Sequence, residues 1–497
     1  MRVTKTTEKR ETDILIIGAG IAGCAAAQAA AEAGAGVLVV EQAATVTAHG
    51  LDVGAIGSRL QRAAGVEIDP REAARLLYQW GQSKANFALL RVFTERSGEV
   101  MDRYVTLAEQ YGLDVRLNDS MTARADWNEL EPRFRQFRTA HNFSPKGVIA
   151  TPEDKAAIRF FVNMLRTDAE KHGAEFRFRT EAKRLTKRND RVTGAVAVCG
   201  DTEVRITARK GVILASGGIT EDTKLLSAVC PEALRADKNE YYPKNGNSGA
   251  ALRMALRAGA APTRSGAAPV IHPVNFTALG PGIQTSWLMV NRDGVRFCCE
   301  MGWEPLVTNA RLNAPGNVAW AIWDSNYAAH LRRQEPVKAG FLLDGLEEKV
   351  ERDVAAGDYL RADSLGALAA QMGVPAQALE ETVRRYNANC AAGEDPDFGV
   401  PARFLSSVEQ EPFYAGKISA WLLNVPYGVH VDANSQVLTE SDEPIPGLFA
   451  VGNMQGDFFA NSYPVTCPGA NHGRGVTFGN LVGRALAKGE TIDGGKA

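Results

Sequence analysis

The segment 13–41, DILIIGAGIAGCAAAQAAAEAGAGVLVVE, constrains the fold more than any other part of the chain. It joins an apolar run, a glycine-rich loop, an alanine-rich stretch and a second apolar run that ends in an acid. This order predicts a strand, a phosphate-binding loop, a helix and a strand, which together form the βαβ unit that binds dinucleotides. We therefore predict an α/β protein with a Rossmann-like dinucleotide site near its N-terminus.

The residues of this loop each have a physical role in holding a pyrophosphate. Three glycines stand in GxGxxG spacing: Gly18 permits the tight turn, Gly20 lets the backbone approach the pyrophosphate, and Gly23, which follows Ala22, lets the helix pack on the sheet. Glu41 ends the second strand, where a carboxylate accepts hydrogen bonds from ribose hydroxyls. No Arg beside it offers to bind a 2′-phosphate.

Length, charge and cysteine content narrow the class of protein. A chain of 497 residues exceeds the usual size of one hydrophobic core, so two or three packed units are expected. The 56 basic and 58 acidic residues nearly cancel, which argues against a nucleic-acid or anionic-membrane partner. The seven Cys include no CxxC or CxxCH, so we expect reduced thiols and no metal site, attached haem or disulfide framework.

The N-terminus is similar to a signal peptide, because Lys5, Lys9 and Arg10 precede an apolar stretch. Several glycines and Glu32 interrupt that stretch, so we interpret it as the βαβ unit. We expect no transmembrane segment and a cytoplasmic location.

Local patterns predict the elements of the remaining chain. Apolar residues at three- and four-residue spacing predict helices, and alternating segments bounded by turn residues predict the strands of a β-meander. The helices are expected at 70–84, 86–112, 247–260 and 375–391, and the strands at 175–179, 192–198 and 203–208.

A change of character suggests an inserted domain. Residues 266–410 mix Pro-bounded strands, helices and a Trp-rich stretch, and we predict an α+β domain there. The first domain is then discontinuous, with residues 1–265 and 411–497, and the segment 413–437 returns to it.

Two further segments resemble flavoproteins of the glutathione-reductase fold. Pro444–Gly456, PIPGLFAVGNMQG, resembles the strand with which these proteins return to cradle the flavin, and Gly211–Gly218, GVILASGG, resembles their middle strand. The resemblance implies FAD as the cofactor. It also implies that Gly217, Gly218, Gly452 and Asn453 bind this cofactor, since glycine is needed where the backbone approaches a ligand closely.

The motifs together resemble the fumarate reductase and succinate dehydrogenase flavoprotein superfamily, which includes soluble ketosteroid dehydrogenases. They are the GAGIAG loop, ASGG, NSGAALRMALRAGA, VNRDGVRF, PFYAGKIS and PIPGLFAVGN, in the family's order over nearly the whole chain. The resemblance implies a glutathione-reductase-type domain, an inserted capping domain, and hydride exchange between flavin N5 and a carbon–carbon bond activated by a carbonyl.

Departures from the family's fumarate-binding residues bear on the substrate. His272, in VIHPV, matches a substrate-side His, but Glu304 stands where the proton-donating Arg is expected and Asn424 where a second His is expected. The final clamp Arg corresponds to His472, with Arg474 two residues on. Because a buried dicarboxylate needs charge-assisted partners, the resemblance argues against fumarate or succinate.

The ketosteroid branch agrees better with the C-terminal part of the chain. Cys467–Gly479, CPGANHGRGVTFG, aligns without gaps to its corresponding segment. The resemblance implies that Tyr463 and the backbone N–H of Gly469 polarise the substrate carbonyl, although two more residues separate them here than in that branch. The alternative for Tyr463 is a core residue.

Other candidates each have a second interpretation. His49, beside Gly50, matches the loop along the flavin edge, where its side chain is either covalently joined to the flavin or only hydrogen-bonded. Glu304 is the expected proton donor if the closed cap raises its pKa, and otherwise Tyr427 or Tyr463 carries the proton. Arg474 either assists at the carbonyl, binds substrate oxygen or pairs with a carboxylate. Tyr427 and Trp303 are expected to line the pocket or to be core aromatics.

We therefore predict an FAD-dependent oxidoreductase that reduces or introduces a C=C bond conjugated to a carbonyl in a cyclic, largely apolar ketone. One alternative is a reductase of a small unsaturated acid, with His272 and Arg474 as anion partners. Another is a flavin-bearing electron-relay subunit. An apolar cavity lined by Trp303, Trp320 and Trp323 would favour the ketone. The sequence leaves open the electron partner, the direction of reaction and the oligomeric state.

Overall fold

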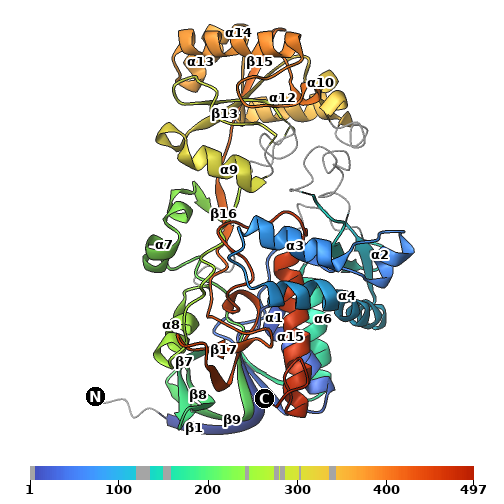
Figure 1. The fold of residues 1–497 in the computed structure, drawn as a ribbon, viewed down its shortest axis with the longest axis vertical. Helices are drawn as coiled ribbons and strands as arrows, with labels where there is room; N and C mark the ends of the chain where they lie inside the picture. Colours follow the sequence, from blue (N-terminus) through green and yellow to red (C-terminus); the bar gives the residue numbers. More distant parts are fainter. Residues whose placement is uncertain are drawn as a thin grey trace. The chain divides into compact units, whose positions relative to one another are not determined.

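The computed structural model describes residues 6–118, 135–148, 158–240, 246–273, 279, 286–301, 304–334 and 343–496. It divides into two compact units (Figure 1). Unit 1 comprises residues 1–229, 241–269 and 424–497, and unit 2 comprises 230–240 and 270–423. Residues 230–240 and 411–423 thus group with unit 2, whereas the sequence placed them in the first domain.

Unit 1 is built on an eight-stranded sheet with the order β17-β18-β9-β1-β2-β6, and β7 and β8 extend it from β9. The four pairings from β18 to β6 are parallel, and β17 pairs antiparallel with β18. Every residue of β2 is buried, as expected for a parallel strand covered on both faces. The strands are β1 (Thr6–Ile17), β2 (Val37–Val40), β6 (Glu175–Arg177), β7 (Thr180–Arg188), β8 (Arg191–Cys199), β9 (Thr202–Leu214), β17 (Gln436–Leu438) and β18 (Pro444–Ala450).

Strands β1 and β9 are longer than the sequence pattern indicated. Thr6–Thr12 pairs with Thr202–Ala208, and after an irregularity Ile14–Ile17 pairs with Gly211–Leu214. One strand therefore contributes both to the β-meander and to the central sheet. Lys9 and Arg10 lie in β1, and Lys5 lies outside the described residues.

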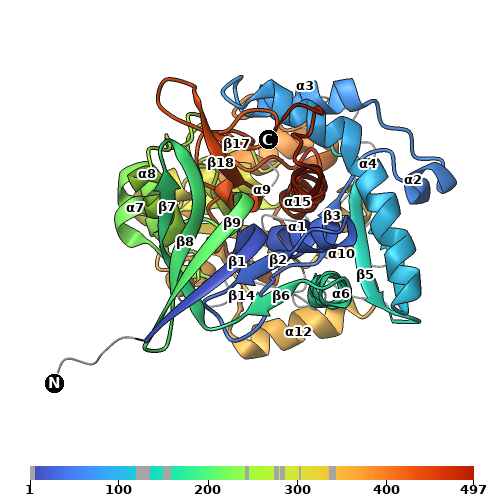
Figure 2. The same cartoon turned by 90° about the horizontal axis from the view of Figure 1, so that it is seen from below.

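Helices α1 (Ile21–Glu32) and α15 (Ala470–Lys488) lie side by side against this sheet (Figure 2). Their backbones approach closely because small residues face one another. A Cβ on Gly479 would lie 2.5 Å from Ala22 O, and one on Gly483 would lie 2.4 Å from Ala26 O. Any larger side chain at these two positions would separate the helices.

The other elements of unit 1 surround this layer. The predicted helices at 70–84 and 86–112 are confirmed as α3 (Pro70–Trp80) and α4 (Phe87–Gln110), which begin after the capping residues Asp69 and Asn86. A second sheet has the order β3-β5-β4. The remaining elements are β3 (Asp52–Gly54), α2 (Arg59–Ala63), β4 (Leu113–Leu117), β5 (Ala140–Pro145), α6 (Ile158–Lys171), α7 (Thr223–Val229) and α8 (Ala250–Arg257).

Unit 2 contains an antiparallel sheet in the order β12-β13-β15-β14. The prediction that 413–437 returns to the first domain is wrong for its first part, because β15 lies between two strands of this sheet. The strands are β12 (Leu288–Asn291), β13 (Ala319–Asp324), β14 (Tyr359–Ala362) and β15 (Phe413–Lys417). The helices are α9 (Glu304–Asn313), α10 (Tyr327–Gln334), α12 (Leu346–Ala356), α13 (Leu365–Met372) and α14 (Ala376–Ala392). A shorter sheet has the order β10 (Lys238–Asn239), β16 (Trp421–Asn424) and β11 (Val270–His272).

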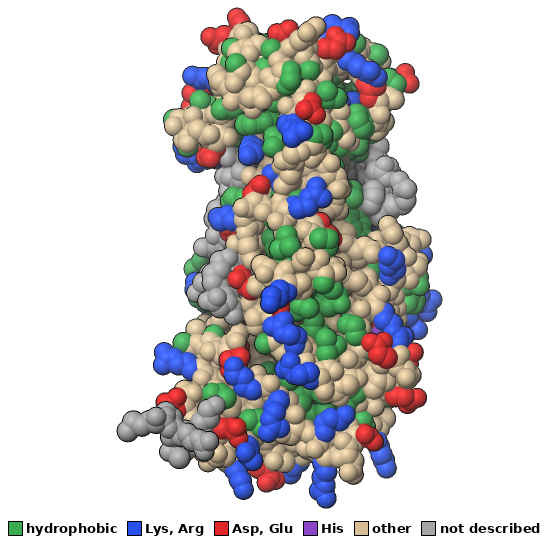
Figure 3. Space-filling model, turned by 90° about the vertical axis from the view of Figure 1, so that its left-hand side faces the viewer, with side chains coloured by type: hydrophobic (Ala, Val, Ile, Leu, Met, Phe, Trp, Pro, Cys, Tyr) green, Lys and Arg blue, Asp and Glu red, His purple; other side chains and the backbone are tan. Residues whose placement is uncertain are grey.

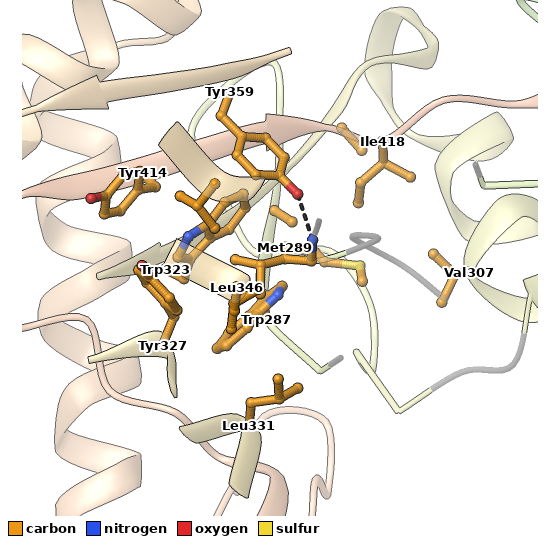
Figure 4. Close-up of a cluster of buried hydrophobic side chains, with 14 of the residues drawn as sticks. Trp287, Met289, Val307, Trp323, Tyr327, Leu331, Leu346, Tyr359, Tyr414 and Ile418 are labelled. Atoms are coloured by element: carbon orange, nitrogen blue, oxygen red, sulfur yellow. Dashed lines mark hydrogen bonds between the residues drawn. The ribbon is translucent and has the colours of Figure 1, made fainter. Parts of the chain in front are cut away.

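The core of unit 2 is aromatic (Figure 4). Trp287 and Trp323 are almost fully buried, with ring centroids 5.9 Å apart, and the Tyr359 hydroxyl accepts a hydrogen bond of 2.7 Å from the Leu279 backbone nitrogen. Trp323 therefore does not contribute to the Trp-lined apolar cavity that would favour a ketone substrate, because this side chain packs inside the unit. Trp303 lies outside the described residues.

Basic and acidic side chains are interspersed over the face shown in Figure 3, in agreement with the nearly balanced composition. Among the described residues, no helix is long and apolar enough to cross a membrane.

Candidate functional site in unit 1

The N-terminus of α1 provides a place for an anionic ligand. Gly20 is the N-cap, no side chain caps the helix, and its first turn contains no acidic residue. A Cβ on Gly20 would have no neighbour nearer than Thr47 O at 3.7 Å. The first N–H groups of a helix lack internal partners, and the helix dipole favours negative charge there. The residues present therefore fit a pyrophosphate.

The other two glycines of the loop are required by the packing of the chain itself. Gly18 has φ +110°, and a Cβ there would lie 2.5 Å from Ala215 O. A Cβ on Gly23 would lie 2.0 Å from Gly18 O. Only the middle glycine thus has free space beside it, and this is the position at which the fingerprint places the pyrophosphate.

Glu41 connects the end of β2 to the phosphate loop. Its Oε2 accepts a hydrogen bond from Ala19 N at 2.8 Å, and its Oε1 accepts one from Ala43 N at 2.8 Å. Each carboxylate oxygen can accept a second hydrogen bond, so the side chain is positioned and still able to bind ribose hydroxyls.

Gly217 and Gly218 are held against an asparagine that the sequence reasoning did not identify. A Cβ on Gly217 would lie 1.8 Å from Asn247 Oδ1, and this oxygen also accepts a hydrogen bond of 3.0 Å from Gly218 N. Asn424 Oδ1 belongs to the same network. It accepts a hydrogen bond of 3.0 Å from Thr220 Oγ1 and one of 3.3 Å from Asn247 Nδ2. The protein therefore fills the space beside Gly217, and the approach of these glycines to a cofactor stays a prediction.

The loop after β2 contacts the N-terminal part of helix α15 through His472. A Cβ on Gly50, the neighbour of His49, would lie 2.6 Å from His472 Cε1, and His472 Nδ1 donates to Asp52 O at 2.8 Å. Burial lowers the pKa of His472, so its imidazole is neutral at pH 7. His472 thus does not supply the positive charge of the Arg that it replaces in the family pattern. The role of His49 stays a prediction.

The carboxyl of Asp52 is buried at the same place. Burial raises its pKa to about 6, against the opposing effect of hydrogen bonds from Asn118 and Asn142. No motif marks this residue, because its burial depends on strands β3 and β5 pairing across almost ninety positions.

Tyr463 caps helix α15. Its hydroxyl accepts a hydrogen bond of 3.1 Å from the backbone nitrogen of Asn471, two residues after the N-cap Gly469. Burial raises the pKa of Tyr463 to about 12, so its proton is present at neutral pH. Since the oxygen accepts from the helix, the O–H remains available to donate. In the described part of the chain, the Gly469 N–H has no hydrogen-bond partner either.

Arg474 lies on the first turns of α15 and is 1% exposed. Its guanidinium donates to Gln455 O at 2.9 Å, Asn453 Oδ1 at 2.9 Å and Asn471 Oδ1 at 3.2 Å. It also lies over the rings of Phe458 and Phe459. Burial lowers its pKa to about 9, which still leaves it cationic at pH 7.

Arg474 lines a small pocket of about 180 Å³, including its open mouth. Tyr427 lies on the same wall, and burial raises the pKa of its hydroxyl. The predicted residues Tyr427 and Arg474 are therefore brought together. The pocket is lined by Thr263, Ser265, Gly266, Pro426, Tyr427, Gln455, Gly456, Asp457, Phe459 and Arg474.

Asp457 is a buried acid of this wall that the sequence reasoning missed. Its Oδ1 accepts from Thr263 Oγ1 and Arg264 N at 2.9 and 2.7 Å, and its Oδ2 from His430 Nδ1 at 2.5 Å. His430 Nε2 in turn contacts Asp442 Oδ1 at 2.8 Å. The backbone of Asp457 has φ +61°, a conformation that few residues other than glycine adopt. The hydrogen bonds of its carboxylate hold the chain in this turn.

The remaining predicted residues belong to unit 2. His272 ends β11, and Glu304 is the first residue of α9, but its side chain lies outside the described residues. Among the side chains that the structure describes, no group of three His, Cys, Asp or Glu could hold a metal ion.

Comparison with known proteins identifies the cofactor. The family model described as "FAD binding domain" matches residues 13–466. A 4-oxocyclohexanecarboxylate 2-dehydrogenase of Sinomonas cyclohexanicum is 30% identical over 418 residues, which are 73% of this chain and 64% of that protein.

Two solved structures have a similar fold. The open conformation of a flavocytochrome c3 fumarate reductase has a TM-score of 0.67 at 25% identity, over 96% of this chain and 78% of that one. A 3-ketosteroid-Δ4-(5α)-dehydrogenase from Rhodococcus jostii RHA1 has a TM-score of 0.74 at 24% identity, over 98% and 99% of the two chains.

The residues matched by the family model include both the phosphate loop and strand β18, near the other end of the chain. The predicted FAD cofactor and the predicted superfamily are thereby confirmed, and the fold is a mixed α/β flavoprotein fold. The chain belongs to the family of FAD-binding oxidoreductases that this family model defines, and fumarate reductases are among its relatives.

Proposed function

We propose that unit 1 is a glutathione-reductase-type FAD-binding domain and that unit 2 is an inserted capping domain. We further propose that the protein reduces or introduces a C=C bond conjugated to the carbonyl of a cyclic ketone. FAD, when bound, supplies the hydride acceptor or donor at its N5 atom. The relative from Sinomonas cyclohexanicum, whose name specifies a cyclic ketone, supports this substrate class.

The proposed cofactor residues bind different parts of FAD. The pyrophosphate would be held at the N-terminus of α1, by the loop of Gly18, Gly20, Ala22 and Gly23, and the ribose would be held by Glu41. The residues that would lie along the flavin and ribityl chain are His49, Gly50, Gly217, Gly218, Gly452 and Asn453.

The observation that carries the proposal is the hydrogen bond from Asn471 N to Tyr463 Oη. This bond orients the phenol, stabilises negative charge that develops on its oxygen and leaves the O–H free to donate. Tyr463 O–H and Gly469 N–H together would bind the carbonyl oxygen of the substrate. As a hydride is added to or removed from the β-carbon, charge accumulates on that oxygen, where such donors act most strongly.

When a hydride is added to or removed from the β-carbon, a proton must be added to or removed from the neighbouring α-carbon, and this transfer needs an acid or base. We assign this role to Glu304, since a carboxyl desolvated by a closed cap gains the higher pKa that a proton donor needs. Tyr427, which is protonated at neutral pH, is the alternative donor. His272 and His472 would contact the substrate, and His472, whose pKa is lowered by burial, would do so as a neutral hydrogen-bonding group.

A second candidate function is the reduction of a small unsaturated carboxylic acid. The buried guanidinium of Arg474, which has no acidic partner among the described residues, favours this alternative. A carboxylate would then take the place of the ketone oxygen.

A reoxidation experiment tests these proposals. The holoenzyme is photoreduced without oxygen and mixed with cyclohex-2-enone, 4-oxocyclohex-2-ene-1-carboxylate, its methyl ester, a 3-keto-4-ene steroid, acrylate or fumarate. Rapid recovery of oxidised flavin with the ring ketones supports the main proposal. Recovery with acrylate or fumarate alone would replace it by the second, and recovery with none of them would refute both.

A further inference from the structure

The carboxyl of Asp52 is held by neutral groups. Its Oδ1 accepts a hydrogen bond of 2.8 Å from Asn118 Nδ2, and the side chain of Asn142, which lies opposite Asp52 on strand β5, also donates to the carboxyl. Burial raises its pKa and the two amides lower it, and no charged side chain of the described residues contributes. A negative charge on Asp52 is therefore not balanced by a cation beside it.

The backbone of Asp52 lies against one of the proposed carbonyl-binding donors, Gly469. Strand β3 reaches the N-cap of α15, where Gly54 N donates a hydrogen bond of 2.8 Å to Gly469 O. A Cβ on Gly469 would lie 3.2 Å from the carbonyl carbon of Asp52, and His472 Nδ1 donates to Asp52 O at 2.8 Å. Asp52 is thus a direct neighbour of a group that is proposed to bind the substrate oxygen.

The charge of Asp52 also acts on the other proposed donor, Tyr463. Burial is the main cause of the raised pKa of Tyr463, and the negative charge of Asp52 raises it further. A carboxylate that disfavours negative charge on the phenolic oxygen also disfavours it on an oxygen that the phenol binds. The proposed site therefore combines two donors that stabilise an oxyanion with an acid that opposes the oxyanion while it is ionised.

We propose that Asp52 takes up a proton from solvent when negative charge forms on the substrate oxygen between Tyr463 and Gly469. The inference rests on the proposed function and adds a positioning residue to it. An anion on this oxygen raises the affinity of Asp52 for a proton, and by linkage the protonated carboxyl raises the affinity of the site for the anion. The proton comes from water and returns to water when the charge is lost, so no bond of the substrate is involved.

Other titratable groups lie on the segments around β3. They are His49 in the loop before it, His141 in β5, Tyr463 and Cys467 before α15, and His472 and Arg474 in α15. Burial lowers the pKa of His141 to about 4 and raises that of Cys467 to about 12, so both are neutral at pH 7. Variants of Asp52 separate its proton from those of the other groups.

Proton uptake on binding of an oxyanion tests the proposal. Pentafluorophenolate is ionised at pH 7 and carries its charge on a ring oxygen, as the enolate of a cyclic ketone does, whereas cyclohexanone is neutral. Calorimetric titration of the oxidised holoenzyme, in two buffers of different ionisation enthalpy, counts the protons bound with each ligand. We expect about half a proton or more with the phenolate at pH 7 and about none with cyclohexanone. Absence of uptake with the phenolate would overturn the proposal.

Two variants assign this proton to Asp52. Asp52→Asn and Asp52→Ser should bind the phenolate without proton uptake, and at pH 8 about tenfold or more tighter than wild type, because the repulsion is absent. Asp168→Asn is the matched control, since Asp168 is a buried acid of the same unit held by Gln28 and Tyr111, and it should keep the wild-type uptake. Full proton uptake in the Asp52 variants would overturn the proposal.

The inference and the proposed function can fail separately. Uptake that depends on Asp52, in an enzyme whose reduced flavin no enone reoxidises, would support the inference and refute the proposed function. Reoxidation by ring enones without such uptake would refute the inference alone. A phenolate that binds neither to wild type nor to the Asp52 variants would refute both the inference and the carbonyl site.

Discussion

The phenolic oxygen of Tyr463 lies 3.1 Å from the backbone nitrogen of Asn471, and it accepts the hydrogen bond that caps helix α15. This contact brings the Tyr to the helix terminus whose N-cap is Gly469, although the chain has two more residues between them than the ketosteroid branch. A phenol in this position is oriented by the helix, protonated at neutral pH and free to donate.

The first prediction concerns Tyr463. Tyr463→Phe should slow hydride transfer about a hundredfold or more, because the charge on the substrate oxygen loses one donor. Stopped-flow absorbance of the flavin measures this rate, and the resting flavin spectrum should not change. Tyr104→Phe is the matched control, since the Tyr104 hydroxyl also contacts α15 through Asn480. Equal rates in Tyr463→Phe and wild type would return Tyr463 to a purely structural role.

The second prediction separates two glycines of the phosphate loop. Gly20→Ala should fold, because a Cβ has space there, and should bind FAD at least about tenfold more weakly since the methyl group takes the space of the pyrophosphate. Gly23→Ala should fail to fold, as its Cβ would lie 2.0 Å from Gly18 O. Calorimetric FAD titration of the apoprotein, with circular dichroism for folding, checks both. A Gly20→Ala protein with wild-type FAD affinity would contradict the loop assignment.

The third prediction follows from the raised pKa of Asp52, about 6 in the folded protein. Between about pH 4 and pH 6 the folded state binds the proton more tightly than the unfolded state, so this group lowers stability as pH rises. Asp52→Asn should therefore raise the free energy of unfolding above pH 6 by up to about 3 kcal/mol and leave it unchanged below pH 4. Denaturant unfolding at pH 4 and pH 8 measures the difference. A variant destabilised equally at both values would show that Asp52 is not buried as a protonated acid.

The fourth prediction concerns Glu304. Glu304→Gln keeps size and polarity and removes the titrating group, so turnover should fall by about two to four orders of magnitude with little change in substrate affinity. Steady-state kinetics over a range of pH provides the check. Near wild-type turnover with an unshifted pH profile would remove Glu304 from the mechanism and leave Tyr427 as the next candidate.

Local patterns predicted the βαβ unit and the helices α3 and α4, because hydrophobic spacing, caps and glycines act within a few residues of one another. The same patterns did not assign β15 to its sheet. Its partners β13 and β14 lie far away in sequence, and an apolar five-residue strand fits either unit. Burial of Trp323 in the core of unit 2 depends on the same distant pairings.

The candidate site was predictable to a similar extent. Glycine spacing indicated the phosphate loop, and the resemblance to a family indicated Tyr463 and Gly469. Asp457 and Asp52 carry no local signal, since their partners come from other segments of the chain. Among the residues that the structure describes, Arg474 has no acidic partner, and this is likewise a property of the folded chain, because the sequence contains many acidic residues.

The central claim is that the enzyme acts on a C=C bond activated by a carbonyl, and one comparison tests it most directly. Photoreduced holoenzyme is mixed, without oxygen, with 4-oxocyclohex-2-ene-1-carboxylate or with cyclohex-3-ene-1-carboxylate, which has the same ring and charge but an isolated double bond. We expect the enone to reoxidise the flavin at least about a thousandfold faster, since only the enone places developing charge on an oxygen. Similar rates for the two compounds, or no reoxidation by the enone, would contradict the claim.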